Sequence, residues 1–588
     1  SMYRTRRTAV SAGRGLSAIA LALALVASGC GDSEEVADPD ATTTTAASGE
    51  MPGGDADCSP VEWDDVADGG EFVDYAQLVS AGDNTSFDPA AVQTLDESQI
   101  TNSLFDGLTD FDYSNGCEPE LKGLAAESWE VNDDSTEFVF TIKEGLEFSN
   151  GEPVLPHNFK QAWERLGSKE LGAAYSYLIS FIKDGSKLNE GELDTLDSIV
   201  ADDEAMTLTV TLEAPLSDFP AIVSFAPLSP ITDEDLARVG NTTGWGKNGV
   251  YIGNGPFVLD SAEASDQGEV VMTPNESWAG DVTGYKDVVL DKVTFKIISD
   301  VESAFQAFDS GEGDASTIPS GKYKSAMAKY PNTVGETMLG TYYFDIGHED
   351  PVLGGEKNLK LRQALALAVD RSEINDKAYE GVRQISTGVT PPGIPGFEMG
   401  LGEFATTDVD RAKELYQEWQ DEGNELSGDI TISFNAGGSH QTVVEVMQAN
   451  IKDVLGIDVK LNPIDEDYFK VIAEEGGCQI CRAGWYADYP TYGNFMVDLF
   501  SRASIGLNNF GRFSDDEFEE LIADALKESD EDKRGELYRS AEKRLLNDTA
   551  YVIALNWYTG DQVFRDTVGN YKPNPLGAVP WERVGFKK

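Results

Sequence analysis

The segment CRAGWYADYP, residues 481–490, brings together side chains suited to a small molecule that carries both charges. Arg482 offers a guanidinium, Asp488 a carboxylate, and Trp485 a large aromatic face between them. A guanidinium pairs with a carboxylate through two parallel hydrogen bonds, and a carboxylate accepts hydrogen bonds from an ammonium. Two interpretations stay open: a turn closed by an ion pair between Arg482 and Asp488, or a site for a ligand with both groups.

Residues for catalysis or metal binding form no recognised motif elsewhere in the sequence. His157, His348 and His440 are far apart, and none lies in H-E-x-x-H. Gly321-Lys322 lacks the first glycine and the Ser/Thr of a P-loop, and the G-x-S-x-G elbow of hydrolases is absent. The sequence therefore predicts no enzyme, no cofactor and no metal site. An envelope enzyme or a sensor lipoprotein is the less favoured alternative.

Hydrophobic periodicity predicts the elements that must position these residues. The order strand (429–437), helix (439–456), strand (457–464) is a β-α-β unit and indicates an α/β lobe. Further strands are expected within 138–153 and 205–215, and helices at 358–371 and 514–529. Ser514 and Glu517 have the spacing of a capping box at the start of the last of these helices.

The overall charge limits the possible partners. The chain of 588 residues has a formal net charge of −60, and its acidic residues are spread throughout. Nucleic-acid binding needs a basic surface, so we expect no nucleic-acid partner. A hydrophobic content of 40% is that of a globular protein, and we interpret the excess acid as a solvated surface.

The N-terminus has the pattern of a secretory signal. Four arginines precede the apolar segment 16–29, which ends in small residues directly before Cys30. This order resembles the lipobox of bacterial lipoproteins, which implies cleavage before Cys30 and lipidation of that cysteine. The alternative is an ordinary secretory signal followed by a chance cysteine. Residues 31–57, rich in Thr, Ala, Gly and Asp, are expected to form a flexible tether.

Four further cysteines remain after Cys30. Outside the cytoplasm they should be oxidised, and four cysteines allow three pairings, of which we predict Cys58–Cys117 with Cys478–Cys481. The C-x-x-C spacing of the second pair also suits a redox centre or half of a zinc site. No second Cys or His pair completes a zinc site, and because disulfides persist outside the cytoplasm we favour a structural disulfide over a redox centre.

Several blocks resemble one known family. LAAESWEVNDDSTEFVFTIKEGLEFSNGEPVLPHNFKQAWERL (124–166) is similar to the signature of the family 5 extracellular solute-binding proteins of ABC importers, the dipeptide- and oligopeptide-binding proteins and their relatives. LRQALALAVDR (361–371) with TPPGIPGF (390–397) resembles a helix and loop of that family. RAGWYADYP (482–490) looks closest to the oligopeptide binders. The blocks follow the family order over nearly the whole mature chain.

This resemblance implies an α/β, two-lobed, periplasmic-binding-protein-like fold (type II, cluster C, three domains) with mixed sheets and a hinge that closes on ligand. We place the two hinge crossings near Gly340 and Asn556. The expected segments are a signal peptide (1–29), a tether (30–57), domain I (58–95, 225–339 and 556–588), domain II (96–224) and domain III (340–555).

The resemblance also implies roles for individual residues. The position of Asp488 is where the family's peptide binders receive the peptide α-ammonium, and Arg482 could reach the carboxylate of a short peptide. Trp485 is expected to wall a side-chain pocket, although a core position is an alternative. Further candidates are the backbone of Ala483, Gly484 and Tyr486 as a strand-pairing edge, Asn84, Thr85 and Ser86 across the cleft, and Tyr177 and Trp557 on the cleft wall.

The function implied is that of a lipid-anchored receptor on the outer face of the cytoplasmic membrane. It would capture oligopeptides by closure of its lobes and deliver them to an ABC permease, and we expect it to act as a monomer. A different ligand within the same family, such as an oligosaccharide, a metal chelate or haem, is the alternative. An oligosaccharide binder would need stacked aromatic rings more than Asp488, and only three histidines are available for a nickel site.

Overall fold

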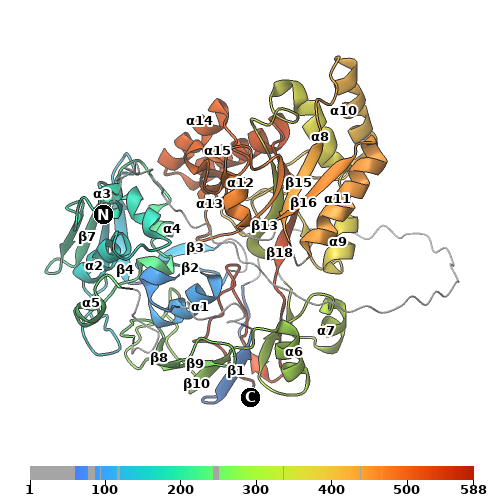
Figure 1. Cartoon of the computed structure of the whole chain (residues 1–588). Coiled ribbons are helices and arrows are strands. Elements are labelled where there is room, and N and C mark those ends of the chain that lie inside the picture. The colour runs from blue at the N-terminus through green and yellow to red at the C-terminus, as the bar shows by residue number, and fades with distance from the viewer. Residues whose placement is uncertain are drawn as a thin grey trace, which may run out of the picture.

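The computed structural model describes residues 60–76, 86–92, 94–115, 119–242, 251–335, 337–436, 439–464 and 467–588. Two lobes meet across a seam: the first lies at the lower left of Figure 1 and the second at the upper right. Each lobe has its own large hydrophobic core, the first around Trp163 and Trp581 and the second around Trp419 and Phe500. The predicted mixed α/β architecture is confirmed.

A seven-stranded mixed sheet forms the base of the first lobe and joins distant parts of the chain. Its strand β1 pairs in parallel with both β10 and β11, and β11 pairs in turn with β19 from near the C-terminus. In spatial order the strands are β12 (Thr333–Val334), β19 (Gln562–Phe564), β11 (Ala315–Thr317), β1 (Glu71–Tyr75), β10 (Lys292–Lys296), β9 (Glu269–Pro274) and β8 (Phe257–Ala262).

A four-stranded antiparallel sheet forms the outer part of the first lobe. Its strand β5 alternates, with Phe138, Phe140 and Ile142 buried, because one face packs on the core while the other faces water. In spatial order the strands are β4 (Ala126–Val131), β5 (Glu137–Ile142), β7 (Thr207–Thr211) and β6 (Ile199–Asp202). Two short pairs complete the strands: β2 (Thr109–Asp112) with β3 (Glu120–Gly123), and β20 (Val568–Gly569) with β21 (Gly585–Phe586).

A six-stranded mixed sheet forms the centre of the second lobe. The predicted β-α-β unit is confirmed, because β15 and β16 are parallel and the helix α11 connects them. In spatial order the strands are β14 (Gln384–Ile385), β18 (Val552–Thr559), β13 (Thr337–Ile346), β17 (Ile480–Tyr486), β15 (Ile430–Asn435) and β16 (Val459–Ile464). The chain passes between the two large sheets after β12, which ends at Val334, and again between Thr559 of β18 and Gln562 of β19. Gly340 and Asn556, where we placed the crossings, lie inside strands of this sheet.

Helices pack around the sheets of both lobes (Figure 1). Those of the first lobe are α1 (Leu95–Leu104), α2 (Pro156–Leu166), α3 (Gly185–Asn189), α4 (Phe219–Ile222), α5 (Asp233–Val239), α6 (Val301–Asp309) and α7 (Tyr323–Lys329). Those of the second lobe are α8 (Leu359–Ala368), α9 (Arg371–Tyr379), α10 (Val409–Asp421), α11 (His440–Leu455), α12 (Tyr468–Ala473), α13 (Gly493–Phe500), α14 (Asp516–Lys527) and α15 (Glu531–Lys543).

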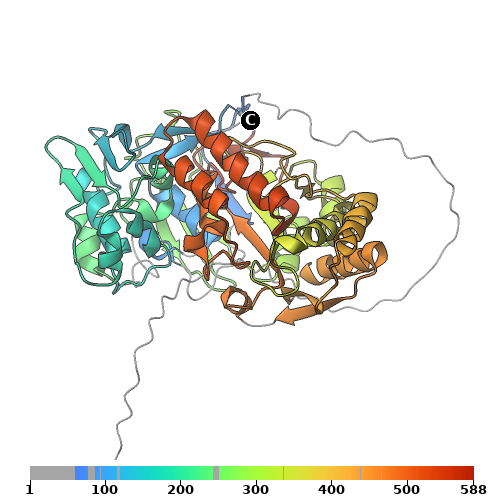
Figure 2. The same cartoon turned by 90° about the horizontal axis from the view of Figure 1, so that it is seen from above.

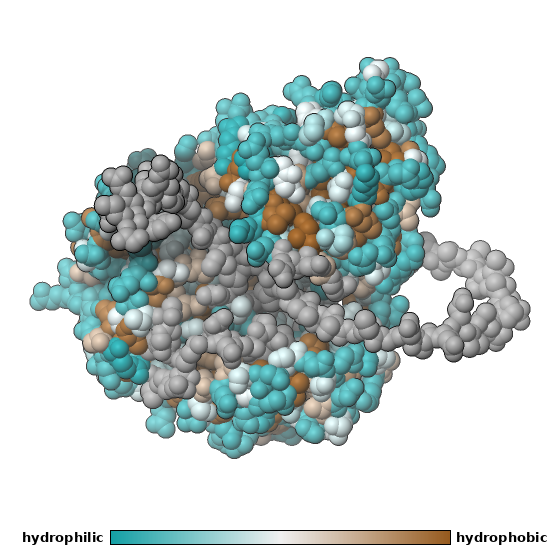
Figure 3. Space-filling view, viewed as in Figure 1, coloured by the Kyte–Doolittle hydropathy of each residue, from teal (hydrophilic) through white to brown (hydrophobic). Residues whose placement is uncertain are grey.

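The start of α14 differs from the predicted capping box. Asp515 is the N-cap and accepts from the Phe518 amide, while the Ser514 hydroxyl accepts from the Arg502 guanidinium. An ionised carboxylate is the better cap because it also stabilises the positive end of the helix dipole. The side of the molecule seen in Figure 3 is largely hydrophilic, as its acidic composition predicts. Among the described helices, none has the length and apolarity that crossing a bilayer requires.

Candidate functional site

The strand β17 carries most of the predicted site residues and has one partly open edge. On one side it pairs with β13 along its whole length. On the other side it pairs with β15 only at Ile480 and Cys481. The Tyr468 hydroxyl lies where the two strands diverge, 2.7 Å from the Arg482 carbonyl and 3.0 Å from that of Ser433. Beyond Arg482, β17 therefore offers an edge without a strand partner among the described residues.

The alternation of the strand decides which backbone groups reach this edge. The Arg482 carbonyl faces away from β13, because Tyr468 binds it from the other side. The Ala487 amide faces the opposite way and donates to Leu339 at the start of β13. Gly484 and Tyr486 share the direction of Arg482, whereas Ala483 faces β13. The prediction for Ala483 was wrong: it is fully buried, and its backbone pairs with Tyr343.

Asp488 lies just beyond the end of β17 and is positioned by a buried asparagine. The Asn494 side-chain oxygen accepts from the Asp488 amide at 3.1 Å and from the Trp485 indole at 2.9 Å. Asn494 is fully buried in the first turn of α13. Sequence reasoning missed Asn494, and its place six residues after Asp488 is the only signal for it. Trp485 is half-buried, with its indole held by Asn494.

Two tyrosines of the first lobe reach Asp488 across the seam. The hydroxyls of Tyr175 and Tyr177 lie 3.4 Å from its two carboxylate oxygens. The structure thus brings together Tyr177 and Asp488, both of which were predicted site residues, and adds Tyr175, which was not. Arg482 and Asp488 form no ion pair within the described residues, so the internal ion pair considered for this segment is not made.

The electrostatic surroundings of Asp488 favour a bound cation. Burial, followed by the neighbouring Asp498 carboxylate, raises the pKa of Asp488 to about 7. Burial raises the pKa of Asp498 to about 6, although this carboxylate accepts hydrogen bonds of 2.9 Å from Tyr489 and Asn494. No lysine or arginine of the described chain pairs with either carboxylate. A ligand ammonium would supply the missing positive charge.

Arg482 has a very different environment inside the second lobe. Its side chain is 7% exposed, with the guanidinium 4.7 Å from the Tyr342 ring centre and 3.4 Å from the Tyr558 hydroxyl. A second contact of 3.4 Å joins it to the Asn435 side-chain oxygen, while its Nε has no hydrogen-bond partner. No carboxylate of the described chain neutralises this cation, although tyrosine faces attract it.

A second arginine, Arg383, extends this arrangement to the space between the lobes. Its guanidinium lies 5.2 Å from the Tyr379 ring centre and 5.1 Å from that of Tyr558, and it donates to the Thr559 carbonyl at 3.3 Å. We call Arg383, Arg482, Tyr342, Tyr379 and Tyr558 the arginine cluster. His440 adjoins it through the Tyr342 hydroxyl, at 2.9 Å. Burial and the charge of Arg482 lower the pKa of His440 to about 3, so this histidine is neutral.

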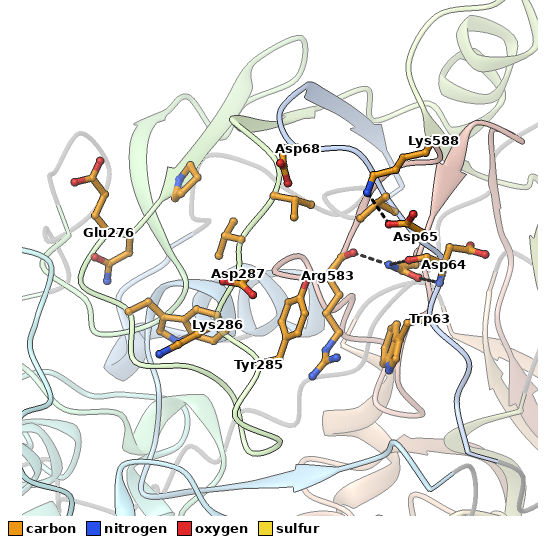
Figure 4. Close-up of a pocket in the computed structure, with 17 residues that line it drawn as sticks. Trp63, Asp64, Asp65, Asp68, Glu276, Tyr285, Lys286, Asp287, Arg583 and Lys588 are labelled. Atoms are coloured by element: carbon orange, nitrogen blue, oxygen red, sulfur yellow. Dashed lines mark hydrogen bonds and ion pairs between the residues drawn. The ribbon is translucent and has the colours of Figure 1, made fainter.

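A cavity of about 750 Å³ opens between the lobes beside these residues. Arg383, Tyr486 and Met338 line it from the second lobe, and Asp106, Asp110 and Glu582 line it from the first. A second hollow, of about 690 Å³, lies on the first lobe, where Arg583 stands between the rings of Trp63 and Tyr285 (Figure 4). None of the predicted site residues lines that second hollow.

Two other predicted site residues lie away from the open edge. Trp557 is fully buried in β18 and donates to the Val389 carbonyl, so it belongs to the core and not to the cleft wall. Ser86 is also buried. Its amide donates to Glu97, so this backbone group is not available to a ligand, and its hydroxyl accepts from the Asp88 amide. Asn84, Thr85, Cys30, Cys58 and Cys117 lie outside the described residues.

The C-x-x-C pair is a disulfide, as predicted. Cys478 and Cys481 are bonded, with their Cα atoms 5.3 Å apart, and both are buried. Cys481 lies in β17 next to Arg482, so the disulfide ties the start of this strand to the loop before it. The described residues hold no group of three or more His, Cys, Asp and Glu side chains arranged to bind a metal ion.

Comparisons with known proteins agree on one family. "Bacterial extracellular solute-binding proteins, family 5 Middle" matches residues 120–506. The dipeptide-binding protein DppE of Bacillus subtilis is 29% identical over 524 residues, covering 87% of this chain and 91% of its own. The periplasmic oligopeptide-binding protein OppA of Salmonella typhimurium is 26% identical over 543 residues, covering 89% and 94%. A solved murein tripeptide-binding protein, MppA in its unliganded open form, has a TM-score of 0.74 at 23% identity, covering 90% of this chain and 99% of that one.

Proposed function

Because the chain belongs to the family 5 bacterial extracellular solute-binding proteins, we propose that it captures oligopeptides between its lobes and delivers them to the permease of an ABC importer. Members of this family bind substrates and are not enzymes. DppE and OppA are named for dipeptide and oligopeptide binding. The observation that carries the proposal is the pair of separate, uncompensated charges at Asp488 and Arg482, near the two ends of one open strand edge.

The amino terminus of the peptide is assigned to Asp488. An ammonium there would neutralise a carboxylate whose pKa is raised to about 7, and the hydroxyls of Tyr175 and Tyr177 are close enough to share in its coordination. Asn494 fixes the position of Asp488, so little ordering is needed when the ligand arrives. N-acetylation of the peptide removes this interaction.

The peptide backbone is assigned to the open edge of β17. Gly484 and Tyr486 direct their amide and carbonyl groups there, which suits an extended peptide that adds as a strand. Such bonds do not depend on peptide sequence, as a receptor for mixed peptides requires. Gly484 is necessary for a further reason: a Cβ there would lie 2.4 Å from the Tyr558 hydroxyl and 3.2 Å from the Arg482 guanidinium. Trp485, half-buried beside this edge, is assigned to the wall of a side-chain pocket.

The carboxylate of the peptide is assigned to the arginine cluster. Arg482 takes the carboxylate of short peptides, and Arg383, which lines the cavity, is available to longer ones. Lipidation of Cys30 would hold the receptor, as a monomer, on the outer face of the cytoplasmic membrane near its permease.

The proposal is tested with purified protein and a panel of peptides of two to eight residues. Native mass spectrometry of the protein as purified first reveals any retained ligand. Each peptide is then assayed by thermal shift in three forms: free, N-acetylated and C-amidated. We expect stabilisation by free peptides and little by the N-acetylated forms. A panel in which no member raises the melting temperature would overturn the proposal.

A further inference from the structure

A set of contacts outside the ligand cavity joins the two lobes on the side of α4. The segment between β7 and α4 of the first lobe meets α14 and α15 of the second, and these two helices lie beside the first lobe when the molecule is seen from above (red in Figure 2). The Ser217 amide donates to the Leu526 carbonyl at 2.9 Å, and its hydroxyl is 3.0 Å from the same oxygen. We call Ser217, Asp218, Leu526, Arg534 and Tyr538 the interlobe clasp.

The charged part of the clasp combines the buried Asp218 with the half-buried Arg534. Asp218 is 7% exposed, and its carboxylate lies 3.2 Å from the Arg534 guanidinium and 3.5 Å from the Tyr538 hydroxyl. Arg534 and Tyr538 are one turn apart on α15, so they approach Asp218 together. Phe219 and Ile222, in the core of the first lobe, fix the segment that carries Asp218. Removing one partner of a buried ion pair costs more than removing one from an exposed pair, because the other charge stays desolvated.

The clasp adjoins the residues that hold Asp488. A Cβ at Gly493, the first residue of α13, would lie 3.1 Å from the Asp218 carboxylate and 3.0 Å from the Tyr538 hydroxyl. The next residue, Asn494, holds Asp488 and Trp485. The clasp is thus made in the same arrangement of the lobes that places Tyr175 and Tyr177 against Asp488.

We propose that Asp218, Arg534 and Tyr538 are positioning residues that set how long the protein retains its ligand, although none of them touches it. This inference rests on the proposed function. Tyr538 belongs to the core of the second lobe and Phe219, next to Asp218, to that of the first, so a movement that draws α15 away from α4 breaks the clasp. Release of a ligand held between Asp488 and the two tyrosines requires the lobes to separate. The stability of the clasp therefore enters the barrier to dissociation.

The test is Asp218→Asn, which keeps the shape of the side chain and removes its charge. We expect the dissociation rate of a bound peptide, followed by stopped-flow fluorescence, to rise about tenfold, the equivalent of ~1.4 kcal/mol. Arg534→Gln should give a similar increase. The double variant with exchanged charges, Asp218→Arg with Arg534→Asp, should release the peptide nearly as slowly as the wild type. If the single variants acted only by disturbing the local structure, the exchange would not restore the rate.

Asp515→Asn is the matched control. Asp515 forms a partly buried ion pair with Arg544 at 2.9 Å, but both residues belong to the second lobe. This variant should lower the melting temperature and leave the dissociation rate within twofold of the wild type. A dissociation rate that is unchanged in Asp218→Asn, or raised equally in Asp515→Asn, overturns the inference.

A separate measurement distinguishes failure of the clasp from failure of the peptide assignment. Val200, on β6, and Val409, on α10, are exposed and lie in different lobes, so spin labels attached there report the interlobe distance. In ligand-free protein, Asp218→Asn should broaden this distance distribution toward longer values, and Asp515→Asn should not. If no peptide binds the wild type, the proposed function fails, and this distance measurement still decides whether the clasp holds the lobes together.

Discussion

The two charged ends of the β17 edge are built in opposite ways. Arg482 is enclosed within one lobe, 7% exposed, and its neighbours Tyr342, Tyr558 and Asn435 all belong to that lobe. Asp488 lies at the seam, and its carboxylate meets tyrosines that are 311 and 313 residues away in the sequence and belong to the other lobe. The cationic end is therefore complete within the second lobe, whereas the anionic end needs both lobes.

This difference assigns different tasks to the two ends. A preformed cationic end costs nothing further when a ligand binds, so it supplies affinity without depending on lobe position. An anionic end shared by two lobes couples recognition of the ammonium to their approach, because each lobe stabilises the same bound group. Peptides with a free amino terminus should therefore bring the lobes together more than peptides that bind only through their carboxylate.

The largest expected effect is that of Asp488→Asn. Truncating one partner of a desolvated charge pair costs roughly 2–5 kcal/mol, so the affinity for a free-amine peptide should fall about 100-fold by calorimetry. The N-acetylated peptide should bind both proteins equally weakly. Asp458→Asn, at a surface carboxylate that is 87% exposed, is the control and should change neither affinity. If Asp488→Asn lowers the affinity for the free-amine peptide less than threefold, the peptide ammonium does not bind at Asp488.

The pH dependence of binding should follow the raised pKa of Asp488, about 7. An ammonium needs the ionised carboxylate, so affinity for free-amine peptides should increase about 15-fold from pH 5.5 to 7, as the ionised fraction of a group with that pKa does. Above pH 7 the gain should level off, because the peptide α-ammonium itself loses its proton with a pKa of about 8. Ligand-free stability should move the other way. The folded protein holds the proton more tightly than the unfolded chain, so the contribution of Asp488 is fully present below pH ~4 and is lost as the pH rises to 7.

Melting curves recorded from pH 4.5 to 8, with and without peptide, check both trends. Burial also raises the pKa of Asp498 to about 6, and the pKa values of Asp110 and Glu582, which line the cavity, to about 7. These three carboxyl groups therefore also lower the stability of the ligand-free protein as the pH rises. Asp488→Asn should therefore abolish the increase of affinity with pH. The ligand-free variant should still lose stability as the pH rises, but less than the wild type. A pH-independent affinity in the wild type would contradict the assignment of the ammonium to Asp488.

Arg482→Met should have the next largest effect. The affinity for a short peptide with a free carboxylate should fall about tenfold, and the C-amidated peptide should be unaffected. The ligand-free melting temperature should hold or rise, because the variant replaces a buried, unneutralised charge with an apolar side chain of similar length. Arg383→Met is the matched variant. If that substitution alone removes the preference for a free carboxylate, the cationic end is Arg383, and the role of Arg482 is structural.

The residues of the anionic end show how far the sequence alone could reach. Local order was accessible: the β-α-β unit and the C-x-x-C disulfide follow from periodicity and spacing. Asn494 and Tyr175 were not accessible, because neither contact with Asp488 follows a helix or strand period, and Tyr175 is 313 residues away from Asp488 in the sequence. Trp557 was misassigned to the cleft for a related reason. All eight residues of β18 are buried, so the strand has no alternation that separates a core face from a cleft face.

The misassignment of Ala483 has a different cause. The open edge itself could be anticipated from the resemblance, but which residues face it depends on the parity of the strand. A shift of one residue along β17 exchanges the backbone groups that face β13 with those that face the open edge. The contact of the Arg482 carbonyl with Tyr468, which comes from α12 outside the strand, and that of the Ala487 amide with Leu339 fix this parity.

The smallest effect should come from removing the disulfide by Cys478→Ser with Cys481→Ser. It closes a loop of only a few residues, so its loss should cost about 2 kcal/mol of stability. The strand stays paired with β13 from Ile480 to Tyr486 without it, so the affinity for free-amine peptides should change less than twofold. Because Cys481 precedes Arg482, any change should appear at the cationic end, as a weaker preference for the free carboxylate over the amide. Calorimetry with both peptide forms makes this comparison. A tenfold loss that is equal for both forms would show that the whole edge depends on the disulfide, and that the two ends are not built independently.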